Sequence, residues 1–110
     1  MQNRQREGSM AQDEDRLNVR RRVMDVDKSV RNPSLLELAA AIQACSGVEA
    51  CNITVSEIDI ETVGTNVTVE GTALNYDEIV GEIERTGAVV HSLDQVIAGD
   101  RMLEHVPRMR

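Results

Sequence analysis

The sequence has almost no aromatic residues, with one tyrosine, no phenylalanine and no tryptophan in 110 residues. Its core must therefore be built from aliphatic side chains, which each bury less surface than a large aromatic ring. We expect burial between subunits to supplement so thin a core. The same scarcity leaves no platform on which nucleic-acid bases could stack, which disfavours an RNA-recognition module.

Long apolar runs are also missing. No stretch approaches the ~20 apolar residues of a membrane span, and residues 1–15 lack the apolar middle of a secretory signal. We therefore expect a cytoplasmic protein with no membrane partner. The length predicts one domain at residues 16–106, with a disordered lead at 1–15 and a short tail at 107–110.

Positive charge is scarce, because 12 basic residues face 19 acidic ones and Lys28 is the only lysine. A net charge of −7 argues against a nucleic-acid partner, whose phosphates need a basic surface. An acidic, lysine-poor surface suits a cytoplasm of very high salt, where screening removes self-repulsion. This predicts a haloarchaeal source, and an ordinary acidic domain with an arginine bias is the alternative.

Motifs for covalent or redox chemistry are absent as well. Cys45 and Cys51 do not form a Cys-x-x-Cys pair, and the first loop carries Lys28-Ser-Val-Arg31 where small copper chaperones carry that pair. No Ser-His-Asp set, phosphate-binding loop or paired metal-ligand motif occurs. We expect a protein that is not an enzyme, in which Cys45 is a small core residue and no disulfide forms.

The apolar residues predict two β-α-β halves. Alternation indicates strands at 17–26, from 48 or 50 onward, at 64–70 and at 88–93, with a turn near 61–65 in which Gly64 supplies a positive φ. Helical spacing and capping residues indicate helices from Asn32-Pro-Ser34 to Gly47 and from Asn75 to Gly87. In the first strand the apolar residues do not all fall on one face. This split pattern indicates either a bulge or a strand that is covered on both faces. The pattern predicts an α+β, ferredoxin-like sandwich with sheet order 4-1-3-2 and two helices on one face.

Several segments resemble an archaeal family known as domain of unknown function 211. The resemblance runs from about Val23 to Val106, through residues 24–28, 32–34, 47–55, 57–62, 67–71 and 87–99. It implies the same ferredoxin-like fold and a homo-oligomer, with a closed ring as the expected assembly. It implies no established activity.

In this topology three segments, two with acidic residues and one with a histidine, meet at one edge of the sheet. The first strand and its connection to the helix carry two aspartates, the hairpin between strands two and three carries three acids, and the fourth strand carries a histidine. We expect a hard-cation site for calcium or magnesium there, with the candidate ligands Asp25, Asp27, Glu57, Asp59, Glu61 and His91. The alternative is a solvated acidic face. His91 is two residues from both Val89 and Leu93, so it lies on the same face of the strand and we expect it to be largely buried. It could be a metal ligand, a proton-transfer group or a hydrogen-bonded core residue.

The apolar residues of the hairpin and of the segment after the fourth strand exceed what one thin core can hide. The apolar face switches between Val55 and Ile58, which indicates either a hairpin that packs on an adjacent subunit or a bulge. The predicted interface residues are Ile58, Ile60, Val96, Ile97 and Leu103.

The sequence thus predicts a non-enzymatic homo-oligomer that binds a divalent cation or a small ligand on its acidic rim. Two alternatives stay open. One is a regulatory module like the amino-acid-binding ACT domains, with a metabolite at a subunit interface. The other is a structural scaffold without a ligand.

Overall fold

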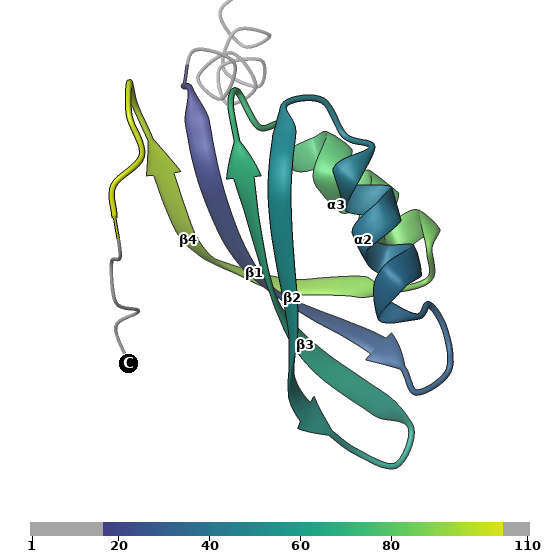
Figure 1. The fold of residues 1–110 in the computed structure, drawn as a ribbon. Coiled ribbons are helices and arrows are strands. Elements are labelled where there is room, and N and C mark those ends of the chain that lie inside the picture. Colours follow the sequence, from purple (N-terminus) through teal and green to yellow (C-terminus); the bar gives the residue numbers. More distant parts are fainter. Residues whose placement is uncertain (1–16, 105–110) are drawn as a thin grey trace, which may run out of the picture.

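The computed structural model describes residues 17–104, which form one four-stranded sheet and two helices (Figure 1). The elements follow in the order β1 (Val19–Ser29), α2 (Leu35–Gln43), β2 (Val48–Ile58), β3 (Thr62–Gly71), α3 (Tyr76–Arg85) and β4 (Val89–Ala98). The strands are arranged β2-β3-β1-β4, and every neighbouring pair is antiparallel. This is the predicted ferredoxin-like β-α-β-β-α-β arrangement. Neither described helix is long and apolar enough to cross a bilayer. The predictions for residues 1–15 and 107–110 lie outside the described range.

Both helices begin at the capping signals of the sequence. Ser34 Oγ accepts a hydrogen bond from the Glu37 amide at 3.1 Å, and the Ser34 amide donates to Glu37 Oε1 at 2.9 Å, which completes a capping box. The first helix therefore starts at Leu35 and not at Asn32. Asn75 Oδ1 accepts from the Glu78 amide at 2.9 Å and caps α3 as predicted.

The main core lies between the helices and one face of the sheet and consists almost wholly of aliphatic side chains. Its fully buried members include Met24 and Val26 of β1, Val67 and Val69 of β3, Leu38 and Ile42 of α2, and Ile79 and Ile83 of α3. Each such side chain contributes roughly 1.5–3 kcal/mol on burial. Tyr76 is only partly buried at the margin of this core, where the guanidinium carbon of Arg22 lies 4.9 Å from its ring centre.

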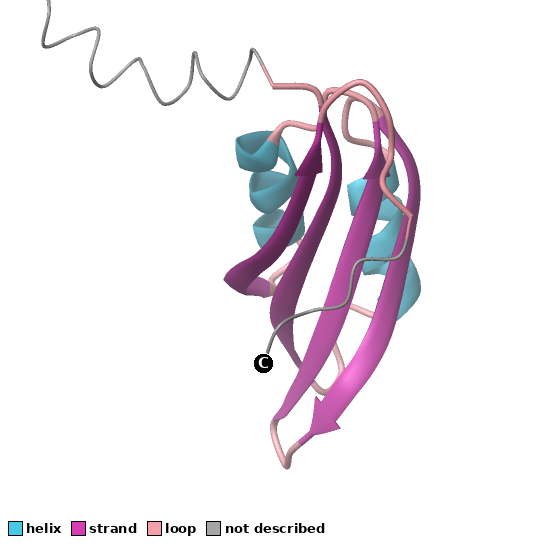
Figure 2. Cartoon of the chain, turned by 90° about the vertical axis from the view of Figure 1, so that its left-hand side faces the viewer, coloured by secondary structure: helices cyan, strands magenta, loops and turns pink. Residues whose placement is uncertain are grey.

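The opposite face of the sheet carries no helix (Figure 2). Its upper part is nevertheless covered, because Val23 and Ile97 are only 6% and 4% exposed although neither belongs to the main core. Cross-strand pairing places both on the face without helices. Val23 is opposite Thr68 of β3. Ile97 is opposite Arg21, which is in turn opposite Glu70 of β3 and forms an ion pair with it. We call the face without helices the open face. Strand β1 is thus covered on both sides at Val23, and the register with β4 leaves Arg20 as an extra residue between Val19 and Arg21, so both explanations of its split apolar pattern apply.

The chain after β4 bends back beside the start of β1. The Gly99 amide donates to the Asn18 carbonyl at 2.9 Å, and the Arg20 side chain donates to the carbonyls of Gly99 and Asp100, both at 2.7 Å. From this bend the described segment up to Glu104 lies on the open-face side of the sheet (Figures 1 and 2). Because β4 extends to Ala98 and not to residue 93, Val96 and Ile97 are strand residues and not part of the tail.

Candidate functional site

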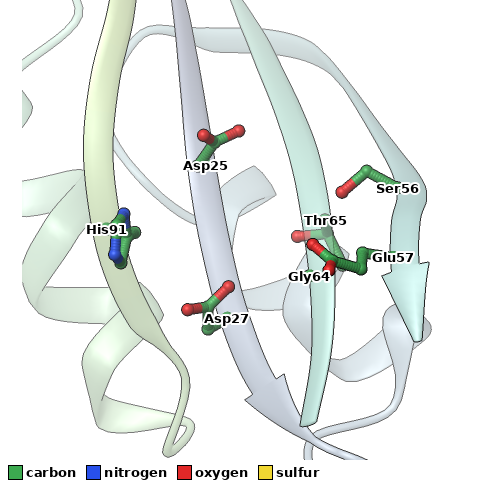
Figure 3. A pocket seen from close by; sticks show the side chains of 7 residues that line it. All are labelled: Asp25, Asp27, Ser56, Glu57, Gly64, Thr65 and His91. Atoms are coloured by element: carbon green, nitrogen blue, oxygen red, sulfur yellow. The ribbon is translucent and has the colours of Figure 1, made fainter. Parts of the chain in front are cut away.

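A depression of about 240 Å³ lies on the lower part of the open face and draws residues from all four strands (Figure 3). Its lining is mostly polar and consists of Asp25, Asp27, Ser56, Glu57, Gly64, Thr65 and His91. We call it the acidic pocket. Four of the six predicted cation ligands line it, while Ser56, Gly64 and Thr65 were not among the predicted residues.

Strand β1 supplies Asp25 and Asp27. The predicted strand ended at residue 26, which placed Asp27 in the connection to the helix; this is wrong, because β1 continues to Ser29. Both lie on the face opposite the buried Met24 and Val26, since side chains alternate along a strand. Asp27 is paired with Gly64 of β3 and with Val89 of β4, which places it at the centre of the pocket.

Strand β2 supplies Glu57 because of a bulge at Ser56. The β2–β3 register passes from Val55 opposite Thr65 to Glu57 opposite Gly64, so Ser56 is the extra residue. The bulge reverses the alternation and turns Glu57 to the open face, where it lies opposite the same glycine as Asp27. Of the two explanations for the switch of the apolar face between Val55 and Ile58, a bulge or a hairpin that packs on an adjacent subunit, the bulge is therefore correct.

Gly64 forms the floor between the two carboxylates. It lies within β3 and its φ is not positive, so the prediction that it supplies a turn is wrong. A Cβ at this position would lie 3.5 Å from Asp27 Oδ1, 3.4 Å from Ser56 Oγ and 3.7 Å from the Glu57 Cβ. The missing side chain thus leaves a space bounded by oxygen atoms from β1 and β2. A glycine inside an otherwise alternating strand is the sequence signal that could have revealed it.

Strand β4 supplies His91 through a second bulge. The β1–β4 register passes from Val26 opposite Val90 to Asp25 opposite Ser92, which leaves His91 as the extra residue. The expectation that His91 is buried is wrong, because it is exposed on the open face. Beside it, Ser92 Oγ lies 3.3 Å from Asp25 Oδ2 and 2.9 Å from Asp94 Oδ1, within hydrogen-bond reach of either carboxylate.

The six predicted ligands do not surround one point. Glu57 and His91 lie on the two edge strands, which are three strand spacings or roughly 14 Å apart. Asp59 lines a smaller adjoining depression with Asp27, Glu57, Thr62 and Gly64, whereas Glu61 lines neither depression. Within residues 17–104 no three His, Cys, Asp or Glu side chains are close enough to hold an ion directly. Any ion there would need water molecules as additional ligands.

The thiols take no part in the acidic pocket. Cys45 is 4% exposed, and its Sγ lies 3.6 Å from the Ala41 carbonyl oxygen. Burial, with smaller contributions from Glu78 and Glu82, raises the pKa of the Cys45 thiol to about 11, and burial also raises the pKa of Cys51. Cys45 is therefore a protonated group of the core at neutral pH, where a thiol is a poor nucleophile.

The raised pKa of Cys45 predicts a loss of stability in alkali. Its pKa moves from 9.0 to about 11 on folding, so the unfolded chain releases this proton first. The free energy of unfolding should be unaffected below about pH 9 and should fall as pH rises from there towards 11. Urea denaturation at pH 8 and pH 10.5 measures this fall. It should be smaller in Cys45→Ala than in Cys51→Ala, and equal falls would contradict the prediction.

Two comparisons with known proteins each cover most of this chain. The family model of domain of unknown function 211 (DUF211), described as uncharacterised ArCR, matches residues 20–110. An uncharacterised protein of Methanocaldococcus jannaschii, MJ0319, is 41% identical over 88 residues, which is 80% of this chain and 90% of the relative. Every residue that lines the acidic pocket lies within the range that the family model matches.

Proposed function

Because the chain belongs to the DUF211 family, which is described as uncharacterised, we propose a function from the geometry of its own pocket. The protein is a non-enzymatic, self-assembling domain that binds a hard divalent cation, calcium or magnesium, in the acidic pocket. The cation lies above Gly64, between the carboxylates of Asp27 and Glu57, and keeps several water ligands. Asp25 and His91 border the opposite side of the pocket and do not share a single ion with Glu57.

The proposal rests on one observation. Asp27 of β1 and Glu57 of β2 lie opposite the same residue, Gly64, whose missing side chain leaves a space beside both acids. Two carboxylates held above a glycine repel one another, and a cation removes that repulsion. The nearby ligand atoms are all oxygens, which calcium and magnesium prefer and softer metals do not. The volume of the pocket leaves room for bound water, which magnesium in particular retains.

One further feature supports self-assembly, and a second supports adaptation to high salt. Ile58 and Ile60 at the β2–β3 hairpin are 73% and 89% exposed, and burial against a neighbouring subunit would stabilise an oligomer, of which a ring is the form we favour. The net charge of −7 with a single lysine favours a cytoplasm rich in salt, as in haloarchaea. Cation binding must therefore be measured at constant, high ionic strength.

Calcium should raise the melting temperature of the wild-type protein, and potassium at matched ionic strength should not. Ligand at 100 times its dissociation constant stabilises the folded state by about 2.7 kcal/mol, which corresponds to several degrees in a domain of this size. Glu57→Gln should abolish most of this increment, because it removes one of the two charges above Gly64. The matched change Glu84→Gln, at an exposed position of α3, should retain it.

Scanning calorimetry with calcium, magnesium and a panel of amino acids distinguishes the alternatives. A response to an amino acid alone would support an ACT-like module, and no response to any addition would support a scaffold. If Glu57→Gln keeps the full calcium increment, the acids are a solvated face and the proposal fails.

A further inference from the structure

The outer edge of β2 is a stretch of backbone that no described strand pairs with. β2 is the first strand of the β2-β3-β1-β4 sheet, so one of its sides is bonded to β3 and the other has no strand beside it within residues 17–104. No described segment lies in front of this edge in Figure 1. The amides and carbonyls of such an edge can pair with a strand from another chain.

The middle of this edge is regular, whereas the opposite edge of the sheet is interrupted. The register with β3 runs without a shift over residues 50–55, and the two bulges of β2, at Glu49 and Ser56, lie at either end of this segment. On the opposite edge, β4 has bulges at His91 and Asp94. Bulges twist an edge away from pairing. Residues 50–55 of β2 are therefore the better site for an added strand.

The side chains of this segment also favour an added strand. Residues 50–55, Ala-Cys-Asn-Ile-Thr-Val, contain no charged residue, although the protein has a net charge of −7. Edge strands that avoid pairing usually carry charges, above all lysine. On the helix side of the sheet, Cys51 and Ile53 pack against the margin of the core and stay partly exposed. A strand beside them would complete their burial.

A second copy of β2 fits this edge in one register better than in the next. Antiparallel pairing about a twofold axis at Asn52 places Cys51 opposite the partner's Ile53, on the helix side of both sheets, and Glu49 opposite the partner's Val55. An axis at Ile53 instead places Glu49 opposite the partner's Glu57. Like charges directly opposite one another destabilise a sheet, so the axis at Asn52 is preferred.

The helix layer leaves room for this pairing. Two helices cover four strands, so each helix takes about two strand spacings, roughly 10 Å, which is the distance between packed helices. A sheet added at β2 brings its own α2 to about that distance from the first. Because α2 carries no charged residue after Glu37, its two copies meet without repulsion.

We propose that two chains join through residues 50–55 of β2, as an antiparallel pair centred on Asn52, and form one continuous eight-stranded sheet. A contact of this isologous kind closes at two subunits. It therefore adds a second contact to the assembly through Ile58 and Ile60. This inference rests on the self-assembly proposed above and is independent of the cation. Subunits held by so short an edge alone separate on dilution.

Disulfide trapping tests the pair and its register. In a C51A background, Asn52→Cys places two thiols opposite one another, where the Cα atoms of an antiparallel pair are about 4.5–5.5 Å apart, within the range of a disulfide. Mild oxidation should convert most chains to a covalent dimer on a non-reducing gel. The control Thr54→Cys in the same background should not, because its two copies are four residues, about 13 Å, apart along the pair. Equal dimer yields in the two variants would overturn the proposal.

Light scattering at high salt tests the contact without a crosslink. Asn52→Lys places two ammonium groups opposite one another at the axis and should lower the particle mass by a factor of about two or more, since each isologous contact joins two subunits. Val89→Lys, at an exposed position of the other edge strand, should leave the mass unchanged. An unchanged mass in Asn52→Lys, without trapping of N52C/C51A, would overturn the edge contact and leave the hairpin contact intact. A wild type that is monomeric at every concentration would refute both contacts.

Discussion

Replacing Ile58 and Ile60 with serine should convert the assembled protein into smaller species, down to the monomer. Both side chains are largely exposed in the single chain, at the end of the β2–β3 hairpin that projects beyond the helices (Figure 1). Each isoleucine removed from water by a neighbour contributes roughly 1.5–3 kcal/mol. Losing two per subunit should weaken association by about two to four orders of magnitude, since 1.4 kcal/mol is a factor of ten. Light scattering coupled to size exclusion at high salt measures the particle mass.

The matched control for this experiment is Leu36→Ser on α2. Leu36 is 83% exposed, so it is as apolar and as accessible as the two isoleucines, but it belongs to a helix and not to the hairpin. Its replacement should leave the particle mass unchanged. An unchanged mass in I58S/I60S would exclude the hairpin as the interface. Of the other predicted interface residues, Val96 and Leu103 are exposed and available, whereas Ile97 is buried within its own chain.

The elements of this fold could be predicted because each of them carries a strong local signal. The capping residues Ser34 and Asn75 fix where the helices begin, and Ile79 and Ile83 recur at helical spacing and are fully buried. Alternation in β3 is uninterrupted from Val63 to Val69, and from it Val67 and Val69 could be assigned to the inward face, where both are fully buried. The order of the strands follows from the β-α-β-β-α-β sequence of elements.

The candidate site was harder to predict because it depends on two bulges, at Ser56 and His91. A bulge shifts the alternation by one residue, and nothing in the local composition states whether a change of apolar phase marks a bulge or the end of a strand. The same ambiguity made β1 and β4 seem shorter than they are and made His91 seem buried. Gly64 was assigned to a turn because a glycine has no side chain that could report which face it occupies.

The close approach of Gly47 and Gly71 holds the register on which this site depends. The Thr72 amide donates to the Gly47 carbonyl at 3.0 Å, next to the first pair of the β2–β3 ladder, Val48 opposite Gly71. A Cβ at Gly71 would overlap the carbonyl oxygen of Gly47, and a Cβ at Gly47 would overlap that of Thr72. Both clashes are with backbone, which cannot rotate away as a flexible side chain can.

Gly71→Ala should therefore destabilise the protein by about 3 kcal/mol, at the upper end of the usual range for overpacking. Gly81→Ala is the control, since Gly81 lies inside α3 with open space at its Cβ, and this change should stabilise the protein by about 0.5–1 kcal/mol. Urea denaturation at constant high salt measures both. Because Glu57 reaches the pocket only in the native register, Gly71→Ala should also reduce the calcium-dependent increment, which Gly81→Ala should preserve. Equal stability of the two variants would show that β2 can shift away from β3 at this end, and that the glycine pair does not hold the register.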